Sequence, residues 1–154
     1  MNLEIIEFSE AYAAFFTSLN IAWLEKYFVV ELVDRKMLLE PQKNIIDKGG
    51  YIYFAKADDK IAGTFALVKV ENGVYELSKM AVEEHFIGKK IGNRMLEFCM
   101  LEAKKLKAEK VILYSNTKLQ PAIHLYKKFG FKEVPLDHSE YERANIKMEI
   151  DIQS

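Results

Sequence analysis

The chain has 154 residues, of which 50% are hydrophobic and 29% are charged, and its formal net charge is −1. This balance is typical of a globular protein rather than a disordered chain, and the length suits one domain over residues 1–154. Because nucleic-acid binding needs a clear basic excess, nucleic acid is not expected as a partner.

The cysteine, the histidines and the distribution of apolar residues exclude several further classes of protein. Cys99 is the single cysteine and the three histidines lie far apart, so neither an internal disulfide nor a metal site is predicted. The first residues lack the basic start and apolar run of a signal peptide, and no segment reaches the ~20 apolar residues of a membrane span. We therefore expect a cytoplasmic protein without a metal or a membrane partner.

The N-terminal third is predicted to hold one strand and then helices. Residues Leu3 to Phe8 favour a strand, and Ser9 is a candidate N-cap for the helix that follows. Apolar residues continue at helical spacing as far as Phe28. Asp34 is a candidate cap for a further short helix that reaches Leu39.

The middle of the chain has the pattern of an antiparallel sheet. Residues 51–55 and 61–70 are predicted strands, separated by a polar turn. Asn72-Gly73 then predicts a hairpin, because both turn positions favour a positive φ. The segment Val74 to Val82 is therefore a third antiparallel strand.

The second half alternates helices with strands. Apolar residues that recur every three to four positions from Ile91 to Leu106 predict a long amphipathic helix. A second helix has Pro121 near its start and Gly130 as its stop. The remaining strands are predicted at residues 111–114, 131–134 and 145–152. We predict an α+β fold of three layers, in which a single mixed, mostly antiparallel sheet carries helices on both faces.

The junction between the third hairpin strand and the long helix has features of an anion site. A helix start offers unpaired backbone N–H groups and the positive end of the helix dipole. Gly88 and Gly92 permit close approach of a ligand, and Lys89 and Lys90 add positive charge. The spacing matches neither the dinucleotide-binding pattern nor the phosphate loop. A loop glycine, two solvated lysines and a helix-packing glycine explain it equally well, so both interpretations stay open.

With its flanks, this junction resembles the signature motif of the GNAT acetyltransferase superfamily, Arg/Gln-x-x-Gly-x-Gly/Ala, whose amides bind the pyrophosphate of CoA. Ile87, Lys90 and Gly92 fall on the three motif positions, and the first two depart from it. Gly88 matches a glycine that commonly follows the first position. Lys90 either restricts the loop or pairs with a phosphate, so the departures bear on CoA affinity.

The flanking segments carry the rest of the resemblance. Residues Glu76 to Val82 resemble the fourth strand of the family, and Asn116 to Phe131 resemble its second motif, Asn-x-x-Ala-x-x-x-Tyr-x-x-x-Gly-Phe with variable spacing. The likeness extends over residues 51 to 134. It implies an acyl-CoA N-acyltransferase-like fold, with a bulge near Lys79-Met80 that opens the sheet for the pantetheine arm.

The resemblance implies an acyltransferase that uses acetyl-CoA as co-substrate and no metal. The implied cofactor-binding residues are Met80, Ala81, Val82, Ile87, Gly88, Lys89, Lys90, Ile91, Gly92, Asn93, Asn116 and Ala122.

It also implies direct transfer of the acetyl group to a primary amine in a ternary complex. A lysine-like amine has a pKa of ~10.4, so a base is useful at neutral pH. Glu76 is the implied base and Tyr126 the implied acid that protonates the CoA thiolate. The alternatives are a glutamate paired with Lys79 on a sheet face and a core tyrosine. Cys99 lies on the apolar helix face and is expected to be inert.

The acceptor is expected to be a small-molecule or peptide amine. The family sets acceptor choice with segments that correspond here to Trp23 to Asp34 and Pro135 to Asn145. In the first, Tyr27, Phe28, Glu31 and Asp34 are candidates to frame the amine, although helix packing and a solvated face explain them too. A non-catalytic acyl-CoA-binding or sensing module is the rival function, and a homodimer, common in the family, stays open.

Overall fold

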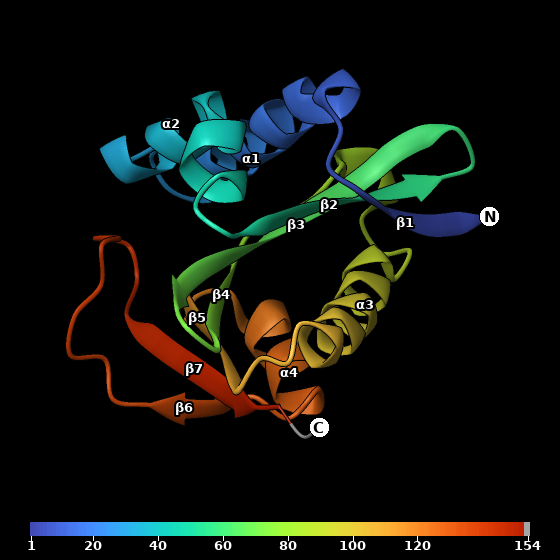
Figure 1. The fold of residues 1–154 in the computed structure, drawn as a ribbon. Coiled ribbons are helices and arrows are strands. Elements are labelled where there is room, and N and C mark those ends of the chain that lie inside the picture. The colour runs from blue at the N-terminus through green and yellow to red at the C-terminus, as the bar shows by residue number, and fades with distance from the viewer. Residues whose placement is uncertain (153–154) are drawn as a thin grey trace.

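The computed structural model describes residues 1–152 and has one seven-stranded sheet with helices packed against it (Figure 1). The strands are β1 Leu3–Glu7, β2 Tyr51–Ala57, β3 Lys60–Glu71, β4 Val74–Val82, β5 Lys110–Ser115, β6 Lys132–Val134 and β7 Ile146–Asp151. The helices are α1 Ala13–Tyr27, α2 Leu32–Leu39, α3 Ile91–Lys105 and α4 Gln120–Lys128. Short helical turns lie at Glu10–Tyr12, Gln42–Ile46 and Glu84–Phe86.

The sheet is mixed and mostly antiparallel, as the sequence predicts. Its strand order is β1-β2-β3-β4-β5-β7-β6. Only the central pair β4 and β5 is parallel among these neighbours, because α3 connects the two strands as a crossover. Asn72-Gly73 forms the predicted turn between β3 and β4, but only Gly73 has a positive φ, and the positive φ expected at Asn72 is not found.

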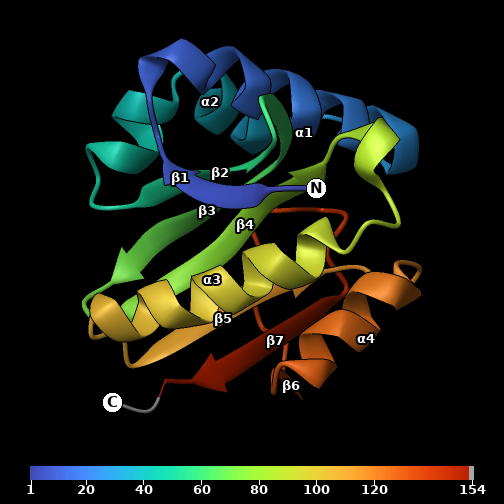
Figure 2. The ribbon, with the colours of Figure 1, turned by 90° about the vertical axis from the view of Figure 1, so that its right-hand side faces the viewer.

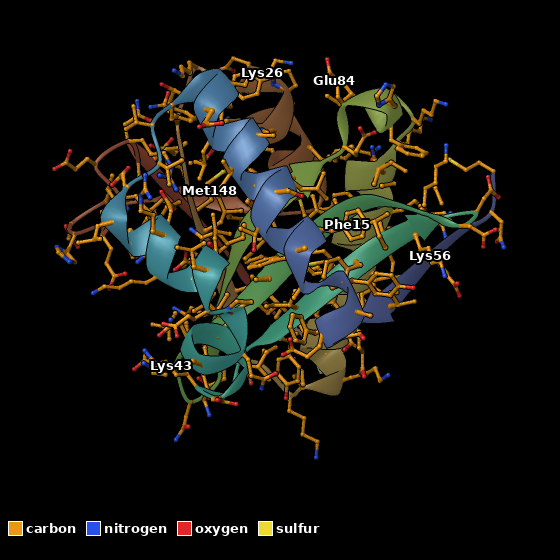
Figure 3. All side chains as sticks on the ribbon, turned by 90° about the horizontal axis from the view of Figure 1, so that it is seen from above. Phe15, Lys26, Lys43, Lys56, Glu84 and Met148 are labelled. Atoms are coloured by element: carbon orange, nitrogen blue, oxygen red, sulfur yellow. The ribbon has the colours of Figure 1, made fainter. Side chains whose placement is uncertain are left out.

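Helices cover both faces of the sheet. Helices α1 and α2 lie on one face, and α3 and α4 lie on the other (Figures 1 and 2). Seen from above, α1 and α2 lie across the strands (Figure 3). Successive side chains of β2 point to opposite faces of the sheet. Ile52 and Phe54 pack with α1 and α2, whereas Tyr53 and Ala55 pack on the α3 side. Each layer therefore has its own buried apolar cluster.

The start of α2 differs from the sequence-based prediction in its cap. Glu31, and not Asp34, is the N-cap residue, and Asp34 lies at the third helical position. The Asp34 side chain accepts a hydrogen bond of 2.9 Å from the Glu31 backbone N–H, while the Glu31 side chain bonds the backbone of the first turn. This reciprocal capping box satisfies two backbone donors, and it uses a carboxylate at both positions here.

The sheet opens between its two central strands. Pairing of β4 with β5 ends at Glu76 opposite Ile112, although both strands continue. On its other edge, β4 has one extra residue between Ser78 and Ala81 relative to β3, and Lys79 there has φ of 55°. The predicted bulge near Lys79-Met80 is confirmed. It turns the end of β4 away from β5 and leaves a gap in the hydrogen-bond ladder. None of the described helices is both long and apolar enough to cross a membrane.

Candidate active site

A cleft of about 260 Å³ lies where β4 and β5 separate. Its walls come from the end of α1, the second half of β4, the end of β5, the first turns of α4 and the segment before β7. The predicted site residues that line it are Glu76, Tyr126, Met80, Ala81, Val82, Ile87, Asn116, Ala122, Tyr27 and Phe28. The fold therefore brings residues from three separate predicted segments into one cavity.

Glu76 lines this cleft, at the last position where β4 pairs with β5. The Tyr141 hydroxyl donates a hydrogen bond of 3.3 Å to its Oε2 atom. Burial raises the pKa of Glu76, and the neighbouring Lys79 ammonium and the Tyr141 hydrogen bond oppose that rise only in part. A carboxylate whose pKa is raised in this way accepts a proton from an amine more readily than an exposed one.

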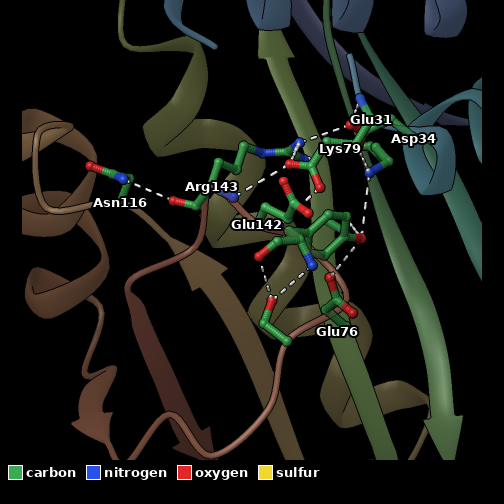
Figure 4. Close-up of polar contacts among 10 residues, drawn as sticks. Glu31, Asp34, Glu76, Lys79, Asn116, Glu142 and Arg143 are labelled. Atoms are coloured by element: carbon green, nitrogen blue, oxygen red, sulfur yellow. Dashed lines mark hydrogen bonds and ion pairs between the residues drawn. The ribbon is translucent and has the colours of Figure 1, made fainter. Parts of the chain in front are cut away.

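Near Glu76 lies a network of two carboxylates and two cations, in which Asp34 and Lys79 are buried and Glu31 and Arg143 are half-buried (Figure 4). Oδ1 of Asp34 accepts from Lys79 Nζ and from Arg143 Nη2, both at 2.8 Å. Oδ2 of Asp34 accepts from Arg143 Nη1 at 2.8 Å, and the same Nη1 lies 3.0 Å from Glu31 Oε2. Burial opposes ionisation of Asp34, but the hydrogen bonds from Arg143 and Lys79 outweigh it and lower its pKa to about 2.

The structure places Asp34 and Glu31 differently from the expectation that they frame an amine. Asp34 has no exposed surface, and its two oxygens are taken by Lys79, Arg143 and the capping amide. Glu31 bonds Arg143 and the backbone N–H of Glu142. Neither carboxylate lines the cleft. Both instead fix the segment before β7, which contributes Tyr141 and Arg143 to the cleft lining, against α2.

Tyr141 is a site residue that the sequence indicates only as part of the segment 135–145. Its buried hydroxyl lies 3.4 Å from Lys79 Nζ and 3.5 Å from Ser78 Oγ, besides its contact with Glu76. Its ring packs under two cations, with Lys79 Nζ at 4.6 Å and the Arg143 guanidinium at 4.7 Å from the centroid. The segment is irregular and gives no periodic signal, so its sequence does not mark this tyrosine.

Tyr126 faces the same cleft from α4. Its ring packs edge-on against Phe131 at 5.9 Å, which fixes its direction. Burial raises the pKa of Tyr126 to about 12, so the hydroxyl stays protonated at neutral pH. A protonated hydroxyl in a cleft is the form that donates a proton to a leaving group.

Asn116 also lines the cleft, but its side chain already has protein partners. Its Nδ2 donates to the Arg143 carbonyl at 2.8 Å, and its Oδ1 accepts from the Lys118 backbone N–H at 2.9 Å. These bonds tie the end of β5 to the segment before β7. Contact of Asn116 with a cofactor therefore stays a prediction.

The start of α3 lies beside the cleft, next to Ile87 in its lining. Lys90 is the N-cap residue in a left-handed conformation with φ of 62°, and no side chain caps the helix. The amides of residues 91–93 therefore have no intrahelical partner. Gly88 has φ of 86° and open space where a Cβ would stand, whereas a Cβ on Gly92 would lie 3.5 Å from Leu125.

These features suit an anion at the start of α3. Gly88 supplies the backbone conformation, whereas a Cβ on Gly92 would make ordinary van der Waals contact with Leu125 of α4, so packing does not require a glycine there. Lys89 and Lys90 are exposed there. Of the other predicted residues, Ile91 is buried and offers only its backbone, and Asn93 is half-buried. Among residues 1–152 no group of three His, Cys, Asp or Glu side chains is placed to hold a metal.

Comparison with known proteins agrees with this geometry. Residues 48–133 match the acetyltransferase (GNAT) domain family. The N-acetyltransferase YvbK of Bacillus subtilis, itself uncharacterized, is 31% identical over 116 residues, which are 73% of this chain and 75% of that protein. The chain belongs to the GNAT acetyltransferase family. As a GNAT protein it is an acetyl-CoA-dependent acetyltransferase, and the family prediction is confirmed.

Solved GNAT structures share its fold. A GNAT acetyltransferase of Staphylococcus aureus aligns with a TM-score of 0.86 at 21% identity, over 99% of this chain and all (100%) of that one. A Bacillus subtilis acetyltransferase in complex with CoA aligns with a TM-score of 0.76 at 20% identity, over 99% and 100% of the two chains. Salmonella typhimurium yncA, solved with acetyl-CoA, aligns with a TM-score of 0.75 at 17% identity, over 100% and 96%.

Proposed function

We propose that the chain moves the acetyl group of acetyl-CoA directly to a primary amine within a ternary complex. The observation that carries the proposal is that Glu76 on β4 and Tyr126 on α4 line one cleft, at the point where β4 and β5 separate. A base with a raised pKa and a protonated acid thus share the cavity. Amide formation from a thioester needs both groups.

The backbone where β4 and β5 separate supports the binding of acetyl-CoA. After Glu76, β4 no longer pairs with β5, so its edge is free to bond the pantetheine arm along residues 80–82. The amide near Met80 is then the donor to the thioester oxygen, which gains negative charge during attack. The unpaired amides at the start of α3 and the adjacent lysines suit the pyrophosphate.

Each proton in the proposed reaction has a destination. The amine nitrogen attacks the thioester carbonyl carbon, a C–N bond forms and the C–S bond breaks. Glu76 first takes one proton from the ammonium form of the amine and passes it to water. As the amide forms, the nitrogen loses a second proton, which replaces the proton that Tyr126 gives to the departing sulfur. Cys99 has no place in this scheme, because burial raises its pKa to about 12 and it does not line the cleft.

The test compares Glu76→Gln and Tyr126→Phe with wild type in an assay of CoA release. Each substitution removes one proton carrier, so kcat should fall by roughly 10²- to 10⁴-fold while acetyl-CoA affinity changes little. Glu71→Gln and Tyr51→Phe, exposed changes on β3 and β2, serve as matched controls and should keep wild-type rates.

Two results would contradict the proposal. Wild-type kcat in Glu76→Gln and Tyr126→Phe would remove both residues from catalysis. Binding of acetyl-CoA without CoA release in the presence of any amine would favour the rival function, a non-catalytic acyl-CoA-binding or sensing module.

A further inference from the structure

We propose that the acetyl acceptor is a monoamine on an aromatic body that carries no carboxylate. This inference rests on the proposed function and deepens it by naming the substrate class. Three observations support it: the walls of the acceptor side are aromatic, the cations that line the cleft are already neutralised, and a single carboxylate in the lining remains for an amine.

Besides Tyr126, five aromatic side chains line the cleft that holds Glu76. Trp23, Tyr27 and Phe28 form a cluster at the end of α1. The centroid of the Trp23 ring lies 5.5 Å from that of Tyr27 and 5.7 Å from that of Phe28. Tyr114 on β5 lies 6.3 Å from Tyr141, and both also contribute to the lining. Trp23 is half-buried and Tyr27 is 37% exposed, so their rings are accessible to a ligand. Such rings bind another aromatic ring by offset or edge-to-face packing.

The cations of the lining are paired with carboxylates of the protein. Lys79 Nζ lies 2.8 Å from Asp34, and Arg143 bonds both Asp34, at 2.8 Å, and Glu31, at 3.0 Å. Two positive charges thus meet two negative charges. A substrate carboxylate would have to break this network or stay unpaired in a buried site, and both are costly. An amino-acid acceptor is therefore disfavoured.

Lys118 is the cation nearest the aromatic cluster, and it is also engaged. Its Nζ donates to the Tyr27 carbonyl at 2.7 Å and lies 4.1 Å from the centroid of the Phe28 ring. It is exposed and does not line the cleft. It holds the end of α1 to the segment before α4.

Among the described residues, Glu76 is the one carboxylate in the cleft lining. It carries one negative charge at most, which matches one ammonium group. Glu140 and Glu142 belong to the segment before β7 but are exposed, and exposed charges are screened by water and salt. A polyamine would bring further positive charges without a buried partner. The geometry thus fits one amine attached to an apolar ring.

The single tryptophan of the chain gives a direct test, because Trp23 lines the cleft. With CoA bound, we would titrate phenethylamine and phenylalanine, which differ only in the carboxylate, and follow Trp23 fluorescence. Phenethylamine should produce a saturable change at a concentration at least about tenfold lower than phenylalanine. Equal or tighter binding of phenylalanine or spermidine, or no response to phenethylamine, would overturn the inference.

A variant separates aromatic recognition from catalysis. Tyr27→Leu should raise the Michaelis constant for phenethylamine several-fold and leave that for ethylamine unchanged, because only the larger amine reaches the ring. Tyr51→Leu is the matched control, since Tyr51 has the same 37% exposure but lies on β2 outside the cleft lining. Equal effects of Tyr27→Leu on both amines would contradict aromatic recognition.

The outcomes distinguish this inference from the proposed function. If phenylalanine or spermidine is acetylated best, the substrate class is wrong and the transferase stands. If phenethylamine perturbs Trp23 but no amine releases CoA, the class stands and the proposed function fails.

Discussion

The Tyr141 hydroxyl lies 3.3 Å from Oε2 of Glu76 and donates a hydrogen bond to it. Tyr141 belongs to the segment before β7, and Glu76 lies on β4, 65 residues earlier. The bond favours the ionised carboxylate, whereas burial favours the protonated form. Together with the Lys79 ammonium, Tyr141 therefore limits how far the pKa of the proposed base rises, and it also fixes the direction of the carboxylate.

Replacement of Tyr141 by Phe should move the acidic limb of the kcat/KM profile to higher pH. The hydrogen bond lowers the pKa of Glu76, so its loss raises that pKa and the active, ionised form is reached later. Near neutral pH the rate should fall by up to about tenfold, the effect of one hydrogen bond. The measurement is the pH profile of CoA release. An unchanged limb, or one displaced to lower pH, would contradict the role of Tyr141.

Asp34→Asn should destabilise the fold by about 3 kcal/mol at pH 7, because it leaves Lys79 and Arg143 without their shared buried partner. Urea unfolding at pH 7 measures this, and Asp137→Asn, an exposed change, should have little effect.

The stability difference between wild type and Asp34→Asn should also depend on pH. The pKa of Asp34 falls from its usual 3.8 to about 2 on folding, so its contribution is complete above pH 3.8 and disappears as the pH falls through 2. The difference should therefore shrink between pH 4 and pH 2 by about 2 kcal/mol. A constant difference would mean that Asp34 does not titrate in this range.

The loop before α3 can be tested with two substitutions at Lys90, whose φ is 62°. Lys90→Gly should raise the free energy of unfolding by up to about 1 kcal/mol, because glycine adopts this conformation without strain. Lys90→Ala keeps the strain and should give no such gain. Both remove the charge, and both should weaken acetyl-CoA binding about two- to fivefold if the ammonium pairs with a phosphate. Tighter binding by Lys90→Gly would show that the loop conformation limits affinity instead.

Much of the fold follows from local sequence signals. Asn72-Gly73 predicts the hairpin because this dipeptide favours tight turns, and Gly73 adopts the positive φ expected of it although Asn72 does not. The regular apolar spacing of α3 likewise predicts its buried face. The bulge at Lys79 is predicted only by the resemblance to the family, since nothing in the local sequence requires a left-handed lysine.

The polar network of the site cannot be predicted in the same way. Asp34 meets Lys79 across 45 residues and Arg143 across 109 residues, and no local pattern pairs them. For that reason the sequence favours an Asp34 that faces a substrate, although the fold buries it. The contact of Tyr141 with Glu76 is not predicted, because Tyr141 lies in an irregular segment whose sequence has no periodic pattern. Residues that act through long-range contacts need the structure.

The most direct test of direct transfer is a single turnover with quenching and mass spectrometry of both the protein and the small molecules. Wild-type protein is mixed with acetyl-CoA first, and the amine that turns over best is added afterwards. Direct transfer predicts unmodified protein throughout, and equal amounts of free CoA and acetylated amine that form together only after the amine is added. An acetylated protein that forms and decays during turnover, or stoichiometric CoA release before the amine, would contradict it.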